Sequence, residues 1–181
     1  MLIDAQRSML LVVDLQERMV PAIPGHEEVI ANATWLVRVA QKLGVPVAAT
    51  EQYAKGLGAT VAPLRTLLPD DAIAGKTRFS CVAAKCLAPL PGNDRPQVVV
   101  VGVETHVCLM QTALELLEEG KEVYVVADCV ASRRAFDRDV ALDRLRQEGA
   151  RIVTREMVAF EWLGEAATPL FREVSRDFLK S

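Results

Sequence analysis

The sequence lacks the features of several classes of protein. The net charge is −3 and no basic stripe stands out, so neither nucleic acid nor an anionic membrane surface is an indicated partner. No run approaches the roughly 18 consecutive apolar residues of a membrane span. The first residues, with Asp4 and Asp14 around a short apolar run, have neither the basic region nor the cleavage site of a signal peptide. We therefore expect a cytoplasmic protein that acts on a small molecule.

Metal and cofactor motifs are also missing. None of the cysteine spacings is C-x-x-C and only two histidines exist, which argues against a structural zinc site. No G-x-G-x-x-G fingerprint for a dinucleotide is present. Gly75-Lys76-Thr77 imitates the end of a phosphate-binding P-loop, but Asp70 stands where the first glycine is required. In a reducing compartment the four cysteines are expected as free thiols, and we expect no cofactor.

The sequence does contain a regular alternation of β-branched runs and helical patterns. With 181 residues, 51% of them apolar, we expect one domain over residues 1–181. The alternation predicts a three-layer α/β/α fold with a doubly wound, mainly parallel sheet of about six strands and Rossmann-like topology. Strands are expected over residues 9–15, 45–50, 72–77, 97–102, 122–127 and 151–154. Helices are expected over residues 27–43, 61–68, 109–118 and 138–148, with short helical turns over 79–87 and two helical pieces over 157–179.

Three groups with chemical potential stand where predicted parallel strands end: Asp14, Lys76 and Cys108. The carboxyl ends of parallel strands share one edge of the sheet, so these groups can converge. A helix terminus and a nearby ammonium would stabilise a Cys108 thiolate, and Asp14 could take the thiol proton and return it to a leaving amine. Backbone N–H groups of the turn before Cys108 would face a developing oxyanion, and the residues of that turn are Val103, Glu104, Thr105 and Val107.

Each group also has a structural interpretation. A free cysteine in an apolar helix is more often a packing residue than a nucleophile. Cys129 also ends a predicted strand, but no helix follows it, so it is interpreted as a pocket wall or packing residue. Cys81 and Cys86 are interpreted as buried small hydrophobes. His106 could orient a water or a substrate, although a histidine in a turn is more often a surface residue.

Five segments, in order along most of the chain, resemble the isochorismatase-like cysteine hydrolases, and most closely the isochorismatase domain-containing proteins. They are VVDLQ at 12–16, TEQYAKGLGAT at 50–60, GKTRFS at 75–80, GVETHVCLMQTALELLEEG at 102–120 and VADCVASR at 126–133. The resemblance implies an Asp-Lys-Cys triad at Asp14, Lys76 and Cys108. It also implies a cis peptide bond between Val103 and Glu104, and self-association into a dimer or larger homo-oligomer.

The loop after the second predicted strand departs from part of that family. Nicotinamidase-type members have an acid and histidines there that bind a metal, whereas residues 51–59 contain no histidine. We therefore predict no catalytic metal. The same loop shapes the substrate pocket in the family, so Gln52 and Tyr53 are the first predicted substrate contacts. Further candidates for this role are Gln16, Phe79, His106 and Cys129.

The leading hypothesis is a cofactor-free cysteine hydrolase that cleaves an amide-type C–N bond of a small molecule through a thioester. Vinyl-ether hydrolysis, as in isochorismatase itself, is an alternative, as is a non-catalytic small-molecule-binding or interaction protein. A thiol redox protein would need Cys129 as the partner of Cys108. If Lys76 and the helix terminus activate Cys108, its thiol should react well below the reference pKa of roughly 8.5.

Overall fold

A parallel sheet of six strands forms the centre of the protein, in the spatial order β3-β2-β1-β4-β5-β6. The computed structural model describes residues 1–179. The predicted α/β class is confirmed, and the order is that of the doubly wound sheet, in which the two halves of the chain diverge from the central pair β1 and β4. The strands are β1 (Ser8–Val13), β2 (Val47–Gln52), β3 (Ile73–Lys76), β4 (Gln97–Val103), β5 (Glu122–Ala131) and β6 (Arg151–Val153).

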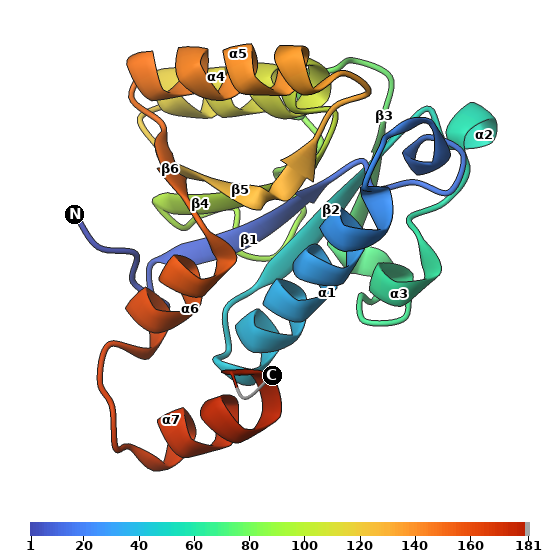
Figure 1. Cartoon of the computed structure of the whole chain (residues 1–181). Helices are drawn as coiled ribbons and strands as arrows, with labels where there is room; N and C mark the ends of the chain where they lie inside the picture. Colours follow the sequence, from blue (N-terminus) through green and yellow to red (C-terminus); the bar gives the residue numbers. More distant parts are fainter. Residues whose placement is uncertain (180–181) are drawn as a thin grey trace.

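Helices cover both faces of this sheet (Figure 1). Helices α1 (His26–Lys42), α3 (Ala62–Arg65) and α6 (Arg155–Leu163) pack on one face, and α4 (Met110–Glu118) and α5 (Ala135–Gln147) on the other. Successive side chains of a strand point to opposite faces. Because helices cover both faces, β1 is buried along its whole length. The shorter elements are η1 (Val20–Ala22), α2 (Ala54–Leu57), η2 (Asp70–Ala72), the π-helical turns η3 (Thr105–Leu109) and η4 (Ser175–Leu179), and α7 (Pro169–Val174).

Strand β5 extends to Ala131, beyond its predicted end at residue 127. The sequence suggested an end there because Asp128 is polar. In the structure the Asp128 carboxylate accepts a hydrogen bond of 2.9 Å from the backbone N–H of Arg155, the first residue of α6. The acid therefore satisfies a helix N-terminus while the strand continues.

The segment predicted to form helical turns over residues 79–87 contains a single turn of that kind, in which Ala84 N–H donates to the Ser80 carbonyl at 3.1 Å, and it does not continue as a helix. Side chains bind the backbone N–H groups that a helix would use. The Ser80 hydroxyl accepts from Val82 N–H at 3.1 Å, and the Glu115 carboxylate accepts from Ala83 N–H at 2.9 Å. Lys85 has a positive φ of 54°, which also interrupts a right-handed helix.

Strands β1 and β4 approach closely at Gly102, where the two halves of the sheet diverge. A β-carbon at this position would lie 2.0 Å from the backbone oxygen of Val13, and the φ of 122° also favours glycine. This contact brings Asp14, which follows β1, beside the turn that carries Cys108. Among the helices formed by residues 1–179, none combines the length and the apolar character that crossing a bilayer requires.

Candidate active site

A buried ion pair between Asp14 and Lys76 lies at the carboxyl edge of the sheet. Lys76 Nζ donates to Asp14 Oδ2 at 2.7 Å, and both side chains are fully buried. Asp14 follows β1 and Lys76 ends β3, so the lysine reaches past the end of β2, which lies between those strands. Asp14 has a φ of 52°, a left-handed conformation that aspartate tolerates better than most residues. The predicted convergence of these two groups is therefore observed.

Neighbouring polar groups complete the hydrogen bonding of the pair. The Thr50 hydroxyl donates to Asp14 Oδ1 at 2.8 Å. Gln52 Oε1 accepts from Lys76 Nζ at 2.8 Å, while Gln52 Nε2 donates to the Thr77 carbonyl at 2.8 Å. A buried ion pair is tolerated when such bonds replace the lost hydration of both charges. Thr50 was not identified from the sequence. The signal that could have found it is a hydroxyl at the end of the otherwise apolar predicted strand over residues 45–50.

Cys108 lies in η3 and is almost fully buried, with 4% exposure. Its thiol lies close enough to Asp14 and Lys76 for both charged groups to shift its pKa. Burial, followed by the negative charge of Asp14, raises the pKa of Cys108 to about 12, although Lys76 acts to lower it. The direction of this shift is opposite to the one that Lys76 and the helix terminus alone would give, because loss of hydration and Asp14 outweigh Lys76.

Lys76 keeps its charge in this environment. Burial acts to lower the pKa of its ammonium, but the charge of Asp14 and the hydrogen bond to it more than offset burial, so the pKa is raised. The site in its resting state is thus a protonated thiol against a carboxylate and an ammonium. Of these, the carboxylate is the group that can accept the thiol proton.

The turn before Cys108 has the cis peptide bond between Val103 and Glu104 that the family resemblance implied. The Glu104 carboxylate accepts from the backbone N–H and Nε of Arg133, at 2.9 and 3.0 Å, and so ties the turn to the chain after β5. The N–H of Val107 donates to the Glu104 carbonyl at 3.1 Å, so this predicted oxyanion donor is engaged within the turn. The Thr105 hydroxyl is buried and has no hydrogen-bond partner among the described residues.

Gln16 and Gln52, both predicted substrate contacts, hydrogen-bond to protein groups. Gln16 is fully buried, and its Nε2 donates to the carbonyls of Gln52 and Gly58 at 3.0 and 2.8 Å. Its Oε1 accepts from Gln52 N–H at 2.7 Å. Both amides are thus occupied by protein groups. These bonds fix the loop after β2 and Lys76, and substrate contact by either glutamine stays a prediction.

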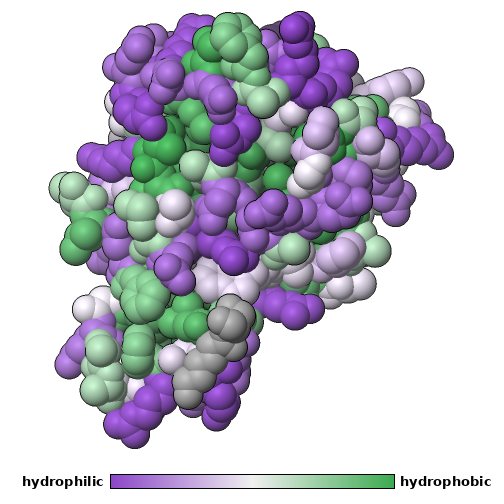
Figure 2. Space-filling view, in the orientation of Figure 1, coloured by the Kyte–Doolittle hydropathy of each residue, from purple (hydrophilic) through white to green (hydrophobic). Residues whose placement is uncertain are grey.

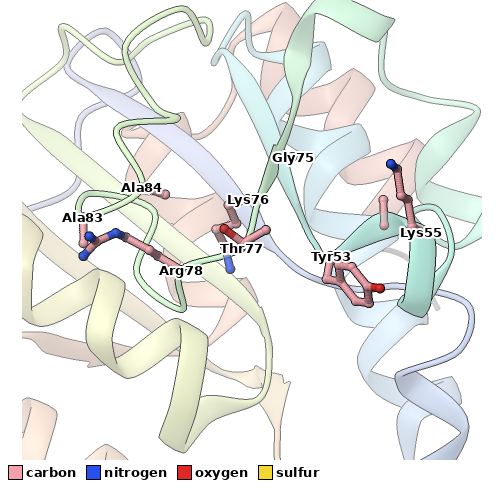
Figure 3. A pocket seen from close by; sticks show the side chains of 9 residues that line it. Tyr53, Lys55, Gly75, Lys76, Thr77, Arg78, Ala83 and Ala84 are labelled. Carbon is pink, nitrogen blue, oxygen red and sulfur yellow. The ribbon is translucent and has the colours of Figure 1, made fainter.

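Tyr53 and Phe79, two predicted substrate contacts, are exposed aromatic residues, with exposures of 56% and 52%. Tyr53 borders a pocket of about 560 Å³. Figure 3 shows Tyr53 and Lys55 on one side of it, Lys76 and Thr77 in the middle, and Arg78, Ala83 and Ala84 on the other side. This is an opening through which a small molecule could reach the carboxyl edge of the sheet.

His106 is half-buried in η3, two residues before Cys108. Its Nδ1 lies 2.9 Å from the hydroxyl of the buried Ser132. This contact holds the imidazole against the residues that follow β5. Across residues 1–179 no group of three or more His, Cys, Asp and Glu side chains is arranged to hold a metal ion.

Cys129 lies on the other side of the sheet from Cys108. It is fully buried in the apolar layer under α1 and α6, whereas Cys108 belongs to the layer under α4 and α5. Burial raises its pKa still further than that of Cys108. The prediction that Cys129 contacts substrate is therefore wrong, and the redox alternative lacks the nearby partner that Cys108 would need, because the sheet separates the two thiols.

A doubly wound parallel sheet with an aspartate, a lysine and a cysteine at its carboxyl edge agrees with the resemblance to the isochorismatase-like hydrolases. Residues 8–157 match the family model described as "Isochorismatase domain". The chain belongs to the isochorismatase family, which confirms the resemblance seen in its motifs.

Three known proteins show what this chain is similar to. Isochorismatase domain-containing protein 1 of Salmo salar is 43% identical over 164 residues, which cover 89% of this chain and 57% of that protein. The chain thus spans little more than half of that relative. The structure named MAR1 ribonuclease from Caenorhabditis elegans is 37% identical, with a TM-score of 0.89 over 100% of this chain and 94% of its own. The YcaC gene product of Escherichia coli, named an octameric hydrolase of unknown specificity, is 25% identical, with a TM-score of 0.84 over 91% and 83% of the two chains.

Proposed function

We propose that the protein is a cofactor-free cysteine hydrolase that cleaves an amide-type C–N bond of a small molecule. The observation that carries this proposal is the fully buried Asp14–Lys76 pair in contact with the protonated thiol of Cys108. A thiol of such high pKa needs an adjacent base to act as a nucleophile at neutral pH. Asp14 is that base, since Lys76 is already protonated.

In the first step the Cys108 sulfur attacks the substrate carbonyl carbon while its proton passes to Asp14. The negative charge that develops on the carbonyl oxygen is stabilised by backbone N–H groups of η3 near Cys108. Asp14 then gives the proton to the leaving nitrogen as the C–N bond breaks. An amine and a thioester of Cys108 are the products of this step.

In the second step a water molecule attacks the thioester carbon and transfers its proton to Asp14. The C–S bond breaks, the acid leaves, and the proton returns to the Cys108 sulfur. Throughout both steps the Lys76 ammonium holds the Asp14 carboxylate in place and offsets the negative charge near the thiol. No external electron acceptor is required, because no atom is oxidised or reduced.

The exposed rings of Tyr53 and Phe79 are the proposed contacts for the rest of the substrate, with His106 as a further polar contact. Of these, Tyr53 lines the pocket that reaches Lys76, whereas Gln16 and Gln52 are bound to protein groups. The pocket volume of about 560 Å³ suits a small molecule.

A screen of small amides and imides, run on the protein and on the Cys108→Ala variant, tests this proposal. We expect turnover by the parent protein and a loss of at least about 10³-fold in the variant, because removal of a nucleophile leaves only binding and oxyanion stabilisation. A covalent acyl adduct on Cys108, seen by mass spectrometry, is expected during turnover.

Two outcomes would favour a different reaction over amide hydrolysis. Vinyl-ether substrates may be added as a panel, and cleavage of these alone, without an adduct, would favour isochorismatase-type chemistry. Cleavage of RNA that is lost in Cys108→Ala would favour the activity named for the Caenorhabditis elegans structure. Turnover of amides at full rate by Cys108→Ala would contradict the proposal.

We also infer that the chain self-associates, as the octameric Escherichia coli protein does. Figure 2 shows hydrophobic residues on the lower surface, over α6 and α7. Met157, Phe160 and Leu170 are exposed there by 46%, 47% and 42%, whereas Trp162 is buried and donates to Ser8 Oγ at 2.7 Å. Light scattering should give the mass of a dimer or larger assembly; a monomer at micromolar concentration would contradict this inference.

A further inference from the structure

Cys81 and Cys86 lie together beside the candidate active site. Between them the chain folds back, since the backbone N–H of Cys86 donates to the Cys81 carbonyl at 3.2 Å. The Cys86 thiol also lies 3.4 Å from that carbonyl oxygen. The closed turn brings the two residues close together, and a disulfide requires α-carbons roughly 4.4–6.8 Å apart. The two thiols are also close enough for each to shift the pKa of the other.

The two thiols of this pair differ in exposure and acidity. Cys81 is fully buried, whereas Cys86 is only half-buried and can be reached from solvent. The hydrogen bond from Cys81, together with the charge of Lys76, lowers the pKa of Cys86 although burial opposes it. The same hydrogen bond, followed by burial, raises the pKa of Cys81. Cys86 is thus the more accessible and the more acidic thiol of the pair, and Cys81 is the buried one. The interpretation of both as buried small hydrophobes is therefore incomplete.

This pair is connected to the triad by direct contacts. The Cys81 sulfur lies 3.7 Å from Thr50 Oγ1, and the Thr50 hydroxyl donates to Asp14. The N–H of Cys81 donates to Thr112 Oγ1 at 3.1 Å, and that hydroxyl donates to the Cys108 carbonyl at 2.7 Å. The residues between the two cysteines, Ala83 and Ala84, line the pocket in Figure 3. A change at Cys81 therefore reaches the environment of both Asp14 and Cys108.

We propose that Cys81 and Cys86 form a redox-sensitive thiol pair that hydrogen peroxide or an organic hydroperoxide converts into a disulfide. The Cys86 thiolate attacks the peroxide, whose O–O bond breaks, and gives a sulfenic acid and hydroxide or alkoxide. The Cys81 sulfur then attacks the Cys86 sulfur, the S–O bond breaks, and water leaves. Both sulfurs are oxidised and the peroxide takes up the two electrons. This proposal does not depend on the reaction catalysed at Cys108.

The test is peroxide treatment of the reduced protein, followed by blocking of free thiols and mass spectrometry of peptides. We expect a Cys81–Cys86 disulfide as the main product, reversed by dithiothreitol. Before oxidation, iodoacetamide at pH 7.5 should label Cys86 at least about tenfold faster than Cys81 or Cys108. In Cys81→Ser, Cys86 should stop at the sulfenic acid and react with dimedone. Cys129→Ser, on the other face of the sheet, should behave as the parent protein.

Two results would overturn this proposal. One is oxidation of Cys108 ahead of Cys86 in the parent protein. The other is conversion of Cys86 to the sulfinic acid without a disulfide, which would mean that Cys81 does not resolve it. Because the readout is the mass of peptides, loss of hydrolytic activity for any other reason does not affect it.

Discussion

Cys108 and Cys129 make the clearest comparison in the molecule, because they share a residue type and a place near the carboxyl edge of the sheet but lie on opposite faces. Burial raises the pKa of both thiols. Cys108 contacts Asp14 and Lys76, whereas Cys129 lies among apolar side chains under α1 and α6. Burial alone therefore does not distinguish a nucleophile from a packing residue. The difference is an adjacent base that can take the proton.

The face that carries Cys108 also concentrates the buried polar groups of the site. Thr50, Lys76 and Asp14 form one hydrogen-bonded set there. Each member depends on the others, because an unpaired buried charge is costly. Substitutions on this face should therefore change stability and turnover more than similar substitutions around Cys129.

Lys76→Met should give the largest loss of stability. It leaves the Asp14 carboxylate buried without its counter-charge, for which about 3–5 kcal/mol of unfolding free energy is expected. Urea unfolding at pH 7 measures this. Lys42→Met is the matched control, since Lys42 pairs with Glu173 on the surface and its removal should change stability little. Equal effects of the two substitutions would mean that the buried pair has no special role.

Gln52→Leu should have an intermediate effect. It removes the hydrogen bond from Lys76 Nζ to Gln52 Oε1, so that the lysine is less well oriented. We expect kcat to fall about tenfold with little change in KM, as for loss of one supporting hydrogen bond. Steady-state kinetics on a substrate from the screen measure both constants. An increase in KM at unchanged kcat would instead support Gln52 as a substrate contact, as the sequence suggested.

Cys129→Ala should have the smallest effect. It removes a buried sulfur from the apolar layer under α1 and α6, which should lower the free energy of unfolding by about 1 kcal/mol. Turnover should stay at the parent level, in contrast to Cys108→Ala. Loss of turnover in a Cys129→Ala protein that unfolds cooperatively would contradict the separation of the two thiols by the sheet.

Much of the fold and the gathering of Asp14 and Lys76 could be predicted, because parallel strands place their carboxyl ends along one edge. The position of Cys129 could not. Strict alternation along β5 would put Cys129 on the same face as Val125, but the pairing with β4 shifts between Val100 and Gly102. That irregularity moves Cys129 to the opposite face. A shift of this kind leaves no recognisable mark in one sequence.

The protonation state of the Cys108 thiol also could not be predicted from the sequence. The helix terminus and Lys76 were visible and both favour a thiolate, but the depth of burial was not. Gln16 and Gln52 illustrate the same limit. Their position in a pocket loop was predictable, whereas the backbone groups that occupy their amides depend on how residues 51–59 fold back over β2.

The rate of Cys108 alkylation by iodoacetamide as a function of pH, followed by peptide mass spectrometry in the parent protein and in Asp14→Asn, tests the central claim most directly. With a pKa of about 12, the parent rate should rise roughly tenfold per pH unit up to pH 10 without a plateau. Asp14→Asn removes the negative charge that opposes ionisation, so alkylation at pH 8 should accelerate while turnover is lost. A parent rate that reaches its plateau below pH 8.5 and is unchanged in Asp14→Asn would contradict Asp14 as the base for a protonated thiol.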